Sequence, residues 1–472
     1  MTRFKTLTII VVAIVLLLFG FFVAQYIFSH KNKTSITRDF PEIKKEGIIR
    51  IAINTNPIDY FIYQGQPMGF QLEMLENFSD SHGLAIDIIV ENDPDKSMEL
   101  LVSGKCDILA QSITNDIENN PEIVFSMPVR QTKLVLVQRV PQDDEKENAT
   151  NIIRDLSELE LKTVYISKSS KSFHTLNSPY GLSLRNYYLV EVDSMPDEQM
   201  IQQVSEGIID YFVCDFNIAR IAQSYYPNID VRTEMSRSQD ISWGIRRKSE
   251  ELLDSLNVWL NEYLKSEDYQ RLQRKYINNN RLYVDIHSEF YSGNEGRICN
   301  YDDLIKKYSV VIGWDWRLLA SLIYEESRFN PDVVSWAGAM GIMQLMPVIY
   351  NKYRDTKLVG VESEIYAGVN YIQFLYTSLS SASADSENMI KLVLAAYNIG
   401  PGHVEDAMRL AAKFEKNPGS WDDVSYFLIN LSNPKYFNDT CVKHGYFPGI
   451  YSVNFANSIV NRYRHYVNII PE

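Results

Sequence analysis

The sequence contains little of what metal and nucleic-acid chemistry requires. It has 7 His and 4 Cys in 472 residues, with no HExxH or CxxC pair and no Walker loop. Its 46 Lys and Arg are outnumbered by 60 Asp and Glu, which gives a net charge of −14. Binding to phosphates depends on clustered positive charge. We therefore expect no metal, no cofactor and no nucleic-acid partner.

Low-complexity segments and internal repeats are also missing, which argues against a fibrous or repeat architecture. The composition is that of a globular protein, with 45% hydrophobic and 12% aromatic residues. A single hydrophobic core stops growing near about 250 to 300 residues. The length therefore predicts two folded domains in addition to any anchor.

The N-terminus carries a long uncharged segment, residues 7–28. About 20 apolar residues span a bilayer, whereas the apolar part of a secretion signal has about 7 to 15. We expect residues 1–6 in the cytoplasm, residues 7–28 as a transmembrane anchor and residues 29–45 as a linker. A long cleaved signal peptide is the alternative. Either reading places the rest of the chain in the cell envelope, on the periplasmic side of a membrane that the sequence does not identify.

Residues 46–277 alternate between strand and helix patterns, which is typical of an α/β sheet. A strand is expected at 48–53, and the pattern begins again with a strand near 162–166. An amphipathic helix over 250–276 closes the segment. Two α/β units in succession are therefore predicted.

Several motifs of this segment, in order, resemble the extracellular solute-binding proteins that capture amino acids. They are "GIIRIAI", "LLVSGKCDILAQSIT", "IVFSMP", "EGIIDYFVCD" and "ISWGIRRKSEELLDSLNVWL". The resemblance implies two lobes around a ligand cleft, joined by hinge strands near residues 129–135 and 235–242.

Two positions of the implied ligand cleft differ in how well they fit an amino acid. Asn119 stands where such binders usually have an arginine for the ligand carboxylate, and amide nitrogens do not replace a bidentate guanidinium. Asp215 remains at the place where the family often binds an ammonium group. We expect a muropeptide or another amine-bearing solute, and a domain that binds no small ligand stays an open alternative.

Residues 278–300 are polar and contain glycine without a helical period, which indicates an interdomain linker. Helical patterns dominate 301–472 and predict an all-α second domain. In an exported chain Cys299 and Cys441 could form a disulfide, whereas Cys106 and Cys214 are expected as small buried residues of strands.

One helical pattern, residues 316–329, ends in two adjacent glutamates, Glu325 and Glu326. At about 100° per residue, Glu326 falls at the centre of the apolar face and Glu325 at its edge. A carboxyl group facing apolar side chains loses hydration, which raises its pKa. The pattern predicts Glu326 as a proton donor and Glu325 as an ordinary surface acid. From the helix alone, a structural ion pair of Glu326 with a buried arginine stays open.

The motifs "ESRFNP", "SWAGAMGIMQLMP" and "LAAYNIGPG" together resemble the soluble lytic transglycosylase domain, a relative of goose-type lysozyme. The resemblance implies a helical, lysozyme-like α+β fold. It also implies cleavage of the β-1,4 bond between N-acetylmuramic acid and N-acetylglucosamine in peptidoglycan, leaving 1,6-anhydromuramyl ends. In that family the glutamate before the serine is the catalytic acid, which is Glu326 here.

The same resemblance implies a substrate-binding set: Ser327, Met343, Gln344, Tyr397 and Asn398. For Met343 a core position is the alternative, and for Asn398 a helix stop. Near the C-terminus relatives often carry Glu-Thr and then Tyr-Val, whereas this chain has Tyr451-Ser452 and Phe455-Ala456. This departure keeps two other readings open, a wall-binding scaffold with little activity and a hydrolytic muramidase.

Overall fold

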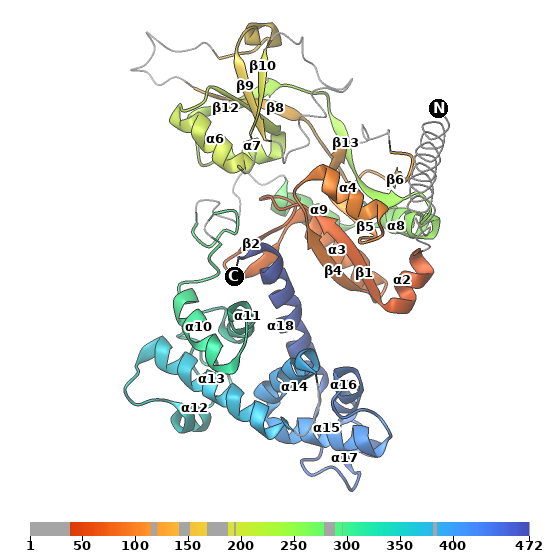
Figure 1. The fold of residues 1–472 in the computed structure, drawn as a ribbon, viewed down its shortest axis with the longest axis vertical. Coiled ribbons are helices and arrows are strands. Elements are labelled where there is room, and N and C mark those ends of the chain that lie inside the picture. The colour runs from red at the N-terminus through yellow and green to blue at the C-terminus, as the bar shows by residue number, and fades with distance from the viewer. Residues whose placement is uncertain are drawn as a thin grey trace, which may run out of the picture.

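The computed structural model describes residues 38–114, 120–140, 152–167, 187–192, 195–277, 288–294, 296–380 and 385–471. The predicted anchor, residues 7–28, lies outside these ranges. Among the helices of the described ranges, none is long and apolar enough to cross a bilayer. The described chain folds into two lobes and a helical domain (Figure 1).

Lobe 1 is built on a mixed sheet in the order β4-β1-β5-β13-β6, with β7 paired to β13. Strand β1 is parallel to β4 and β5, and the returning β13 is antiparallel to β5. The strands of lobe 1 are β1 (Ile48–Ile53), β2 (Phe61–Tyr63), β3 (Gln66–Met68), β4 (Ala85–Val90), β5 (Ile108–Thr114), β6 (Ile123–Phe125), β7 (Arg130–Thr132) and β13 (Gln239–Arg246), of which β2 and β3 form a separate hairpin. Its helices are α2 (Phe40–Glu46), α3 (Phe70–Ser81), α4 (Pro94–Val102), α8 (Glu250–Tyr263) and α9 (Glu267–Tyr276).

Lobe 2 has a second sheet in the order β10-β9-β11-β8-β12. Its elements are β8 (Leu134–Arg139), the short 3-10 helix η1 (Leu156–Leu159), β9 (Thr163–Ser167), β10 (Tyr188–Val192), α6 (Asp197–Glu206), β11 (Tyr211–Asp215), α7 (Phe216–Gln223) and β12 (Ile229–Glu234). The chain crosses between the lobes at Lys133 and again at residues 235–238. Both crossings fall in the predicted hinge ranges, so the two-lobed expectation is confirmed.

The helical domain contains α10 (Asp302–Ser309), η2 (Val310–Ile312), α11 (Trp316–Ser327), α12 (Pro347–Tyr353), α13 (Gly360–Ser378), α14 (Ser386–Ile399), α15 (Pro401–Lys413), α16 (Trp421–Asn430), α17 (Pro434–Phe437) and α18 (Ile450–Ile469). In the described part of this domain, β structure is limited to isolated bridges in the loop between α11 and α12. A continuous core of buried aliphatic and aromatic residues surrounds α11 and α14.

Two local predictions are wrong. The helix expected over 250–276 is two helices, because Ser266 starts a new one by accepting a hydrogen bond from the backbone N–H of Tyr269 (3.1 Å). The four cysteines are free. Cys299 does not pair with Cys441, since its buried thiol donates to Asp302 (3.3 Å) instead.

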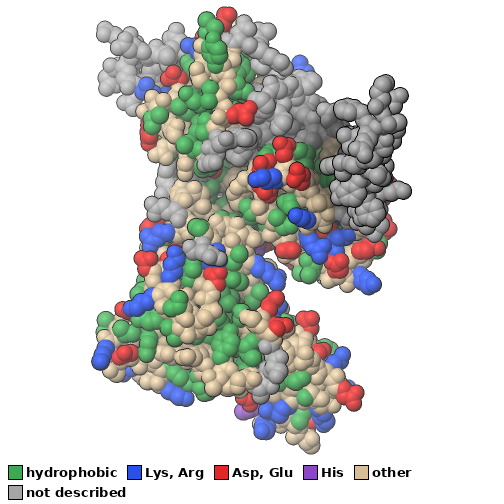
Figure 2. Space-filling model, viewed as in Figure 1, with side chains coloured by type: hydrophobic (Ala, Val, Ile, Leu, Met, Phe, Trp, Pro, Cys, Tyr) green, Lys and Arg blue, Asp and Glu red, His purple; other side chains and the backbone are tan. Residues whose placement is uncertain are grey.

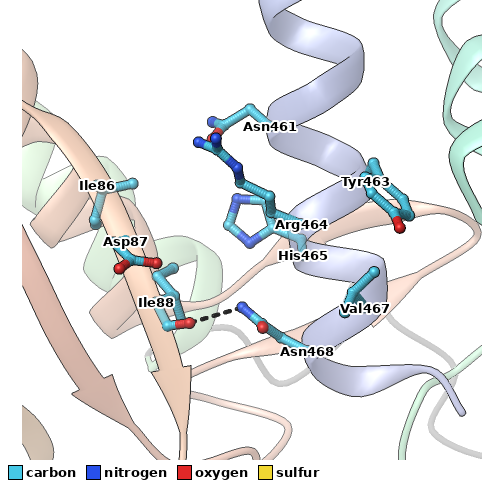
Figure 3. Close-up of a pocket in the computed structure, with 9 residues that line it drawn as sticks. All are labelled: Ile86, Asp87, Ile88, Asn461, Tyr463, Arg464, His465, Val467 and Asn468. Atoms are coloured by element: carbon cyan, nitrogen blue, oxygen red, sulfur yellow. Dashed lines mark hydrogen bonds between the residues drawn. The ribbon is translucent and has the colours of Figure 1, made fainter. Parts of the chain in front are cut away.

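Helix α18 connects the helical domain to lobe 1. Near its end, the Tyr60 hydroxyl bonds to Nδ1 of buried His465 (2.8 Å), and the Tyr466 hydroxyl donates to the Gly65 carbonyl (2.5 Å). Asn468 donates to the Ile88 carbonyl of β4 (2.9 Å), in the pocket drawn in Figure 3. The end of α18 is therefore fixed to two segments of lobe 1, residues 60–65 and strand β4.

The tip of the β2–β3 hairpin lies against the end of α11, where the two elements border a cavity of about 450 Å³. A Cβ atom at Gly65 would lie 2.7 Å from the Phe329 ring and 2.9 Å from Tyr324 and Tyr466. Gly65 also has φ +78°, a conformation that favours glycine. This close approach brings lobe 1 next to the adjacent glutamates.

We predict that Gly65→Ala lowers the free energy of unfolding by about 2 to 4 kcal/mol, the sum of crowding and a strained backbone. Gly83→Ala is the matched control, because Gly83 also has positive φ (+66°) but a Cβ there would meet nothing within 4 Å. Scanning calorimetry should show the larger loss for Gly65→Ala. Equal losses would mean that the hairpin does not pack on α11 in solution.

Candidate active site

The chain turns sharply directly after the two glutamates. Helix α11 begins at its cap Asp315, which accepts a hydrogen bond from the backbone N–H of Arg317 (2.9 Å), and it ends at Ser327. Arg328 and Phe329 follow with φ of +52° and +63°. Two successive left-handed residues are uncommon outside glycine. They stop the helix so that the Glu326 side chain lies at its open end.

Glu326 is half-buried, so it combines desolvation with access from outside. Burial, and then the neighbouring charge of Glu325, together raise the pKa of its carboxyl group from 4.5 to about 8. The prediction that the apolar face raises this pKa is confirmed. A group with such a pKa holds its proton at neutral pH and can release it to a substrate.

Glu325 is not the solvated surface acid that helix phase predicted. It is half-buried, and its Oε2 lies 2.7 Å from Nη1 of Arg462 on α18. The guanidinium of Arg462 also lies over the Tyr324 ring, 4.3 Å from its centroid. The structural ion pair that was an alternative for Glu326 is therefore made by Glu325.

The loop between α11 and α12 is tied to the end of α11 and to α13. The buried Ser327 hydroxyl donates to the Ile342 carbonyl (2.7 Å), and the Ile342 N–H donates to Glu364 (2.7 Å). Gln344, at φ +46°, donates its amide to the carbonyls of Val333 (2.9 Å) and Gly341 (2.8 Å). Ser327 and Gln344 thus hold the loop in place beside Glu326.

Met343 and Tyr397 meet through one hydrogen bond. The Tyr397 hydroxyl donates to the Met343 carbonyl (2.7 Å), while the Met343 side chain is 1% exposed and packs against Gly368. Burial, and then the charge of Glu326, raise the pKa of Tyr397 well above its usual value, so this phenol stays neutral. Met343 reaches the site by its backbone, and Tyr397 lies close enough to Glu326 to sense its charge.

Asn398 is exposed at the end of α14 and is held from α18. Its Oδ1 accepts a hydrogen bond from the fully buried Ser452 hydroxyl (2.7 Å). Ser452 belongs to the segment in which this chain departs from its relatives, and Phe455 packs against the core there. Sequence reasoning missed Arg462 as a partner of the site, because it occurs in none of the motifs. It named Ser452 only as a departure from the family pattern and did not predict its bond to Asn398.

At the start of α7 in lobe 2, Asp215 caps the helix and accepts from the Asn217 N–H and the Thr132 hydroxyl, both at 2.7 Å. The buried Arg130 lies between Asp215 of lobe 2 (3.8 Å) and Asp59 of lobe 1 (3.6 Å). Asn119 lies outside the described residues. Within those residues, no group of three His, Cys, Asp or Glu could hold a metal ion.

Because the pKa of Glu326 is raised in the folded protein, the free energy of unfolding should decrease as the pH rises and Glu326 ionises. The protonated acid is favoured in the fold, so its stabilising effect is complete below pH 4.5 and is lost as the pH rises through about 8. Relative to the wild type, Glu326→Gln should gain about 2 to 4 kcal/mol between pH 4.5 and 8.5, after allowance for partial exposure to water. Calorimetry across this range measures the gap. Exposed Glu262→Gln is the control, and a gap that does not change with pH would contradict the assignment.

Comparison with known proteins matches both domains. Residues 49–279 match the model of bacterial extracellular solute-binding proteins, family 3, and residues 303–419 match the transglycosylase SLT domain. Two relatives, both called membrane-bound lytic murein transglycosylase F, match most of the chain. The one from Desulfosudis oleivorans is 27% identical over 89% of this chain and 90% of its own length.

The relative from Vibrio cholerae is 28% identical over 92% of this chain and 81% of its own length. Among solved structures, the P235GK mutant of ArgBP from T. maritima is 20% identical, with a TM-score of 0.43, and covers 50% of this chain and 98% of its own. The two resemblances carried by the motifs are confirmed. One domain of this chain matches the model of the family 3 extracellular solute-binding proteins, and the other matches the model of the transglycosylase SLT domain.

Proposed function

We propose that the chain is a peptidoglycan lytic transglycosylase in which Glu326 is the catalytic residue. The observation that carries this is a half-buried carboxyl group with a pKa of about 8 at the open end of α11, inside the SLT domain. The substrate is the glycan strand, cut at the β-1,4 bond between N-acetylmuramic acid and N-acetylglucosamine.

The reaction takes place in two steps and needs no water. Glu326 donates its proton to the bridging oxygen while the bond from that oxygen to C1 of the muramyl sugar breaks, and the sugar's 2-acetamido group assists. The muramyl C6 hydroxyl then attacks C1 and gives its proton to the Glu326 carboxylate. The acid is restored, and the product is a 1,6-anhydromuramyl end.

The neighbouring carboxylates favour this route over hydrolysis. A glycoside hydrolase commonly needs a second free carboxylate to activate water or to attack the sugar. Glu325 is committed to Arg462, and Glu364 accepts from the Ile342 N–H. With both occupied, Glu326 acts alone as acid and then as base.

The remaining motif residues have proposed roles in holding the glycan. Tyr397 and Asn398 lie at the end of α14, one buried beside Glu326 and one exposed. We assign Asn398 to an acetamido group and Tyr397 to the reacting sugar. Ser327, Met343 and Gln344 shape the loop that lines this side of the cleft, by the contacts described above.

Digestion of purified sacculi with mass analysis of the products tests this function. The wild type should release fragments lighter by one water molecule than hydrolysis products. Glu326→Gln should release none, a loss of at least about a thousandfold, whereas Glu325→Gln should still release product. Fragments with reducing ends would support a muramidase, and no soluble product from the wild type would support the scaffold.

We further propose that residues 7–28 anchor the chain and that both domains lie in the periplasm. The relatives are called membrane-bound, which supports membrane association. On the face drawn in Figure 2, acidic and basic side chains are interspersed over the helical domain, as expected of a surface that meets water. The solute-binding domain then faces the compartment in which wall fragments are released.

The ligand that we propose for this domain is a muropeptide or another amine-bearing solute held by Asp215. A ligand that binds only the folded protein raises its melting temperature. A muropeptide with a free amine should do so, and the shift should shrink in Asp215→Asn. The same muropeptide with its amine acetylated is the control ligand, and equal shifts from both would exclude recognition of the ammonium group.

A further inference from the structure

Arg462 contacts the residues that precede the catalytic acid, and the mechanism above gives it no part. Its side chain is 17% exposed, its Nη1 pairs with Glu325 (2.7 Å), and its guanidinium covers the Tyr324 ring. Tyr324, Glu325 and Glu326 are consecutive on α11. One arginine therefore clamps two neighbours of Glu326 from a different helix.

The charged and titratable groups around this point come from four helices. Glu325 and Tyr324 lie on α11, neutral Tyr397 on α14, and Glu364 on α13 behind the loop. On α18, burial and then the charge of Arg462 lower the pKa of His465 to about 4, so this ring is uncharged at neutral pH. Tyr466 on the same helix also lies near Arg462 and Tyr324, and Arg328 follows α11 with a second positive charge. Arg462 is the cation that pairs with Glu325.

We propose that Arg462 is a positioning residue of the transglycosylase reaction, which compensates the charge of Glu325 and fixes the end of α11 so that Glu326 can both give and take back a proton. The inference rests on the proposed function. A Glu326 that held its proton too strongly would be a weak acid in the first step. An uncompensated negative charge on the adjacent residue would have that effect.

The geometry favours this role over simple packing. A bidentate or stacked arginine restricts the side chain that it touches more than a lysine does. Here the guanidinium makes one ion-pair contact with Glu325 and lies over the ring of Tyr324. Both contacts fall in the last turn of α11, before the two left-handed residues, where the helix lacks further turns to hold it.

The test is the pH dependence of product release from sacculi. In the wild type kcat/KM should fall above about pH 8, where Glu326 loses its proton. Arg462→Met keeps the packing volume but leaves Glu325 uncompensated, so the alkaline limb should move up by about one pH unit. Glu325→Gln should move the limb down, and the double variant should follow Glu325→Gln.

Arg464→Met is the matched control, because Arg464 lies two residues away on α18 and pairs with exposed Glu387 (3.2 Å). Its profile should match that of the wild type. Arg462→Lys keeps the positive charge, so it should remove most of the shift seen in Arg462→Met. A limb in Arg462→Met that coincides with the control would overturn the inference, even if turnover falls at every pH.

The two proposals fail in different ways. If the wild type makes no anhydro ends, the proposed function is wrong. If the wild type is active and Glu325→Gln leaves the limb in place, only the role of the Arg462–Glu325 pair is wrong. Should Arg462→Met unfold below the assay temperature, Glu325→Gln and Arg462→Lys still decide the question, since both keep a polar group at the altered position.

Discussion

The site depends on one constraint: a carboxyl group that keeps its proton near neutral pH must lose water on one side and stay open to substrate on the other. Glu326 meets it because α11 is buried almost all round and stops one residue later. The surrounding contacts maintain this position. Ser327 ties the loop to the helix end, Tyr397 holds the loop from α14, and Arg462 pairs with Glu325.

Helix phase found the burial of Glu326 because spacing along α11 fixes which side chains share the face that packs into the core. The motifs likewise identified both domain families. The fate of Glu325 could not be read in this way. Its partner Arg462 is 137 residues away, and no spacing rule connects α11 to α18. The helix break at Ser266 could have been found from the sequence. At about 100° per residue, the buried positions of α8 and those of α9 would lie on opposite sides of one continuous helix, and Ser266 caps the second helix.

The altered C-terminal segment shows how a departure from a family pattern can keep its physical content. Ser452 stands where relatives often have threonine, and the hydroxyl that both residues share is the group that binds Asn398. The Ser452 side chain is fully buried, so its hydroxyl is shielded from water where it bonds to Asn398. Tyr451 is 73% exposed, so the departure from the family pattern at this position affects the exposed edge of the site and does not change Glu326.

Helix α18 contacts both the candidate active site and lobe 1. Ser452 and Arg462 on this helix reach the site of cleavage, and His465, Tyr466 and Asn468 bind lobe 1. A helix transmits displacement along its axis because its backbone bonds are internal. Lobe 1 is therefore fixed to the helical domain, so any rotation about the crossings at Lys133 and residues 235–238 would move lobe 2 relative to both. The segment 288–294 contacts both lobes. The Tyr291 hydroxyl lies 3.5 Å from Glu198 of lobe 2, and the backbone N–H of Ser292 donates to the Ile62 carbonyl of lobe 1 (2.9 Å).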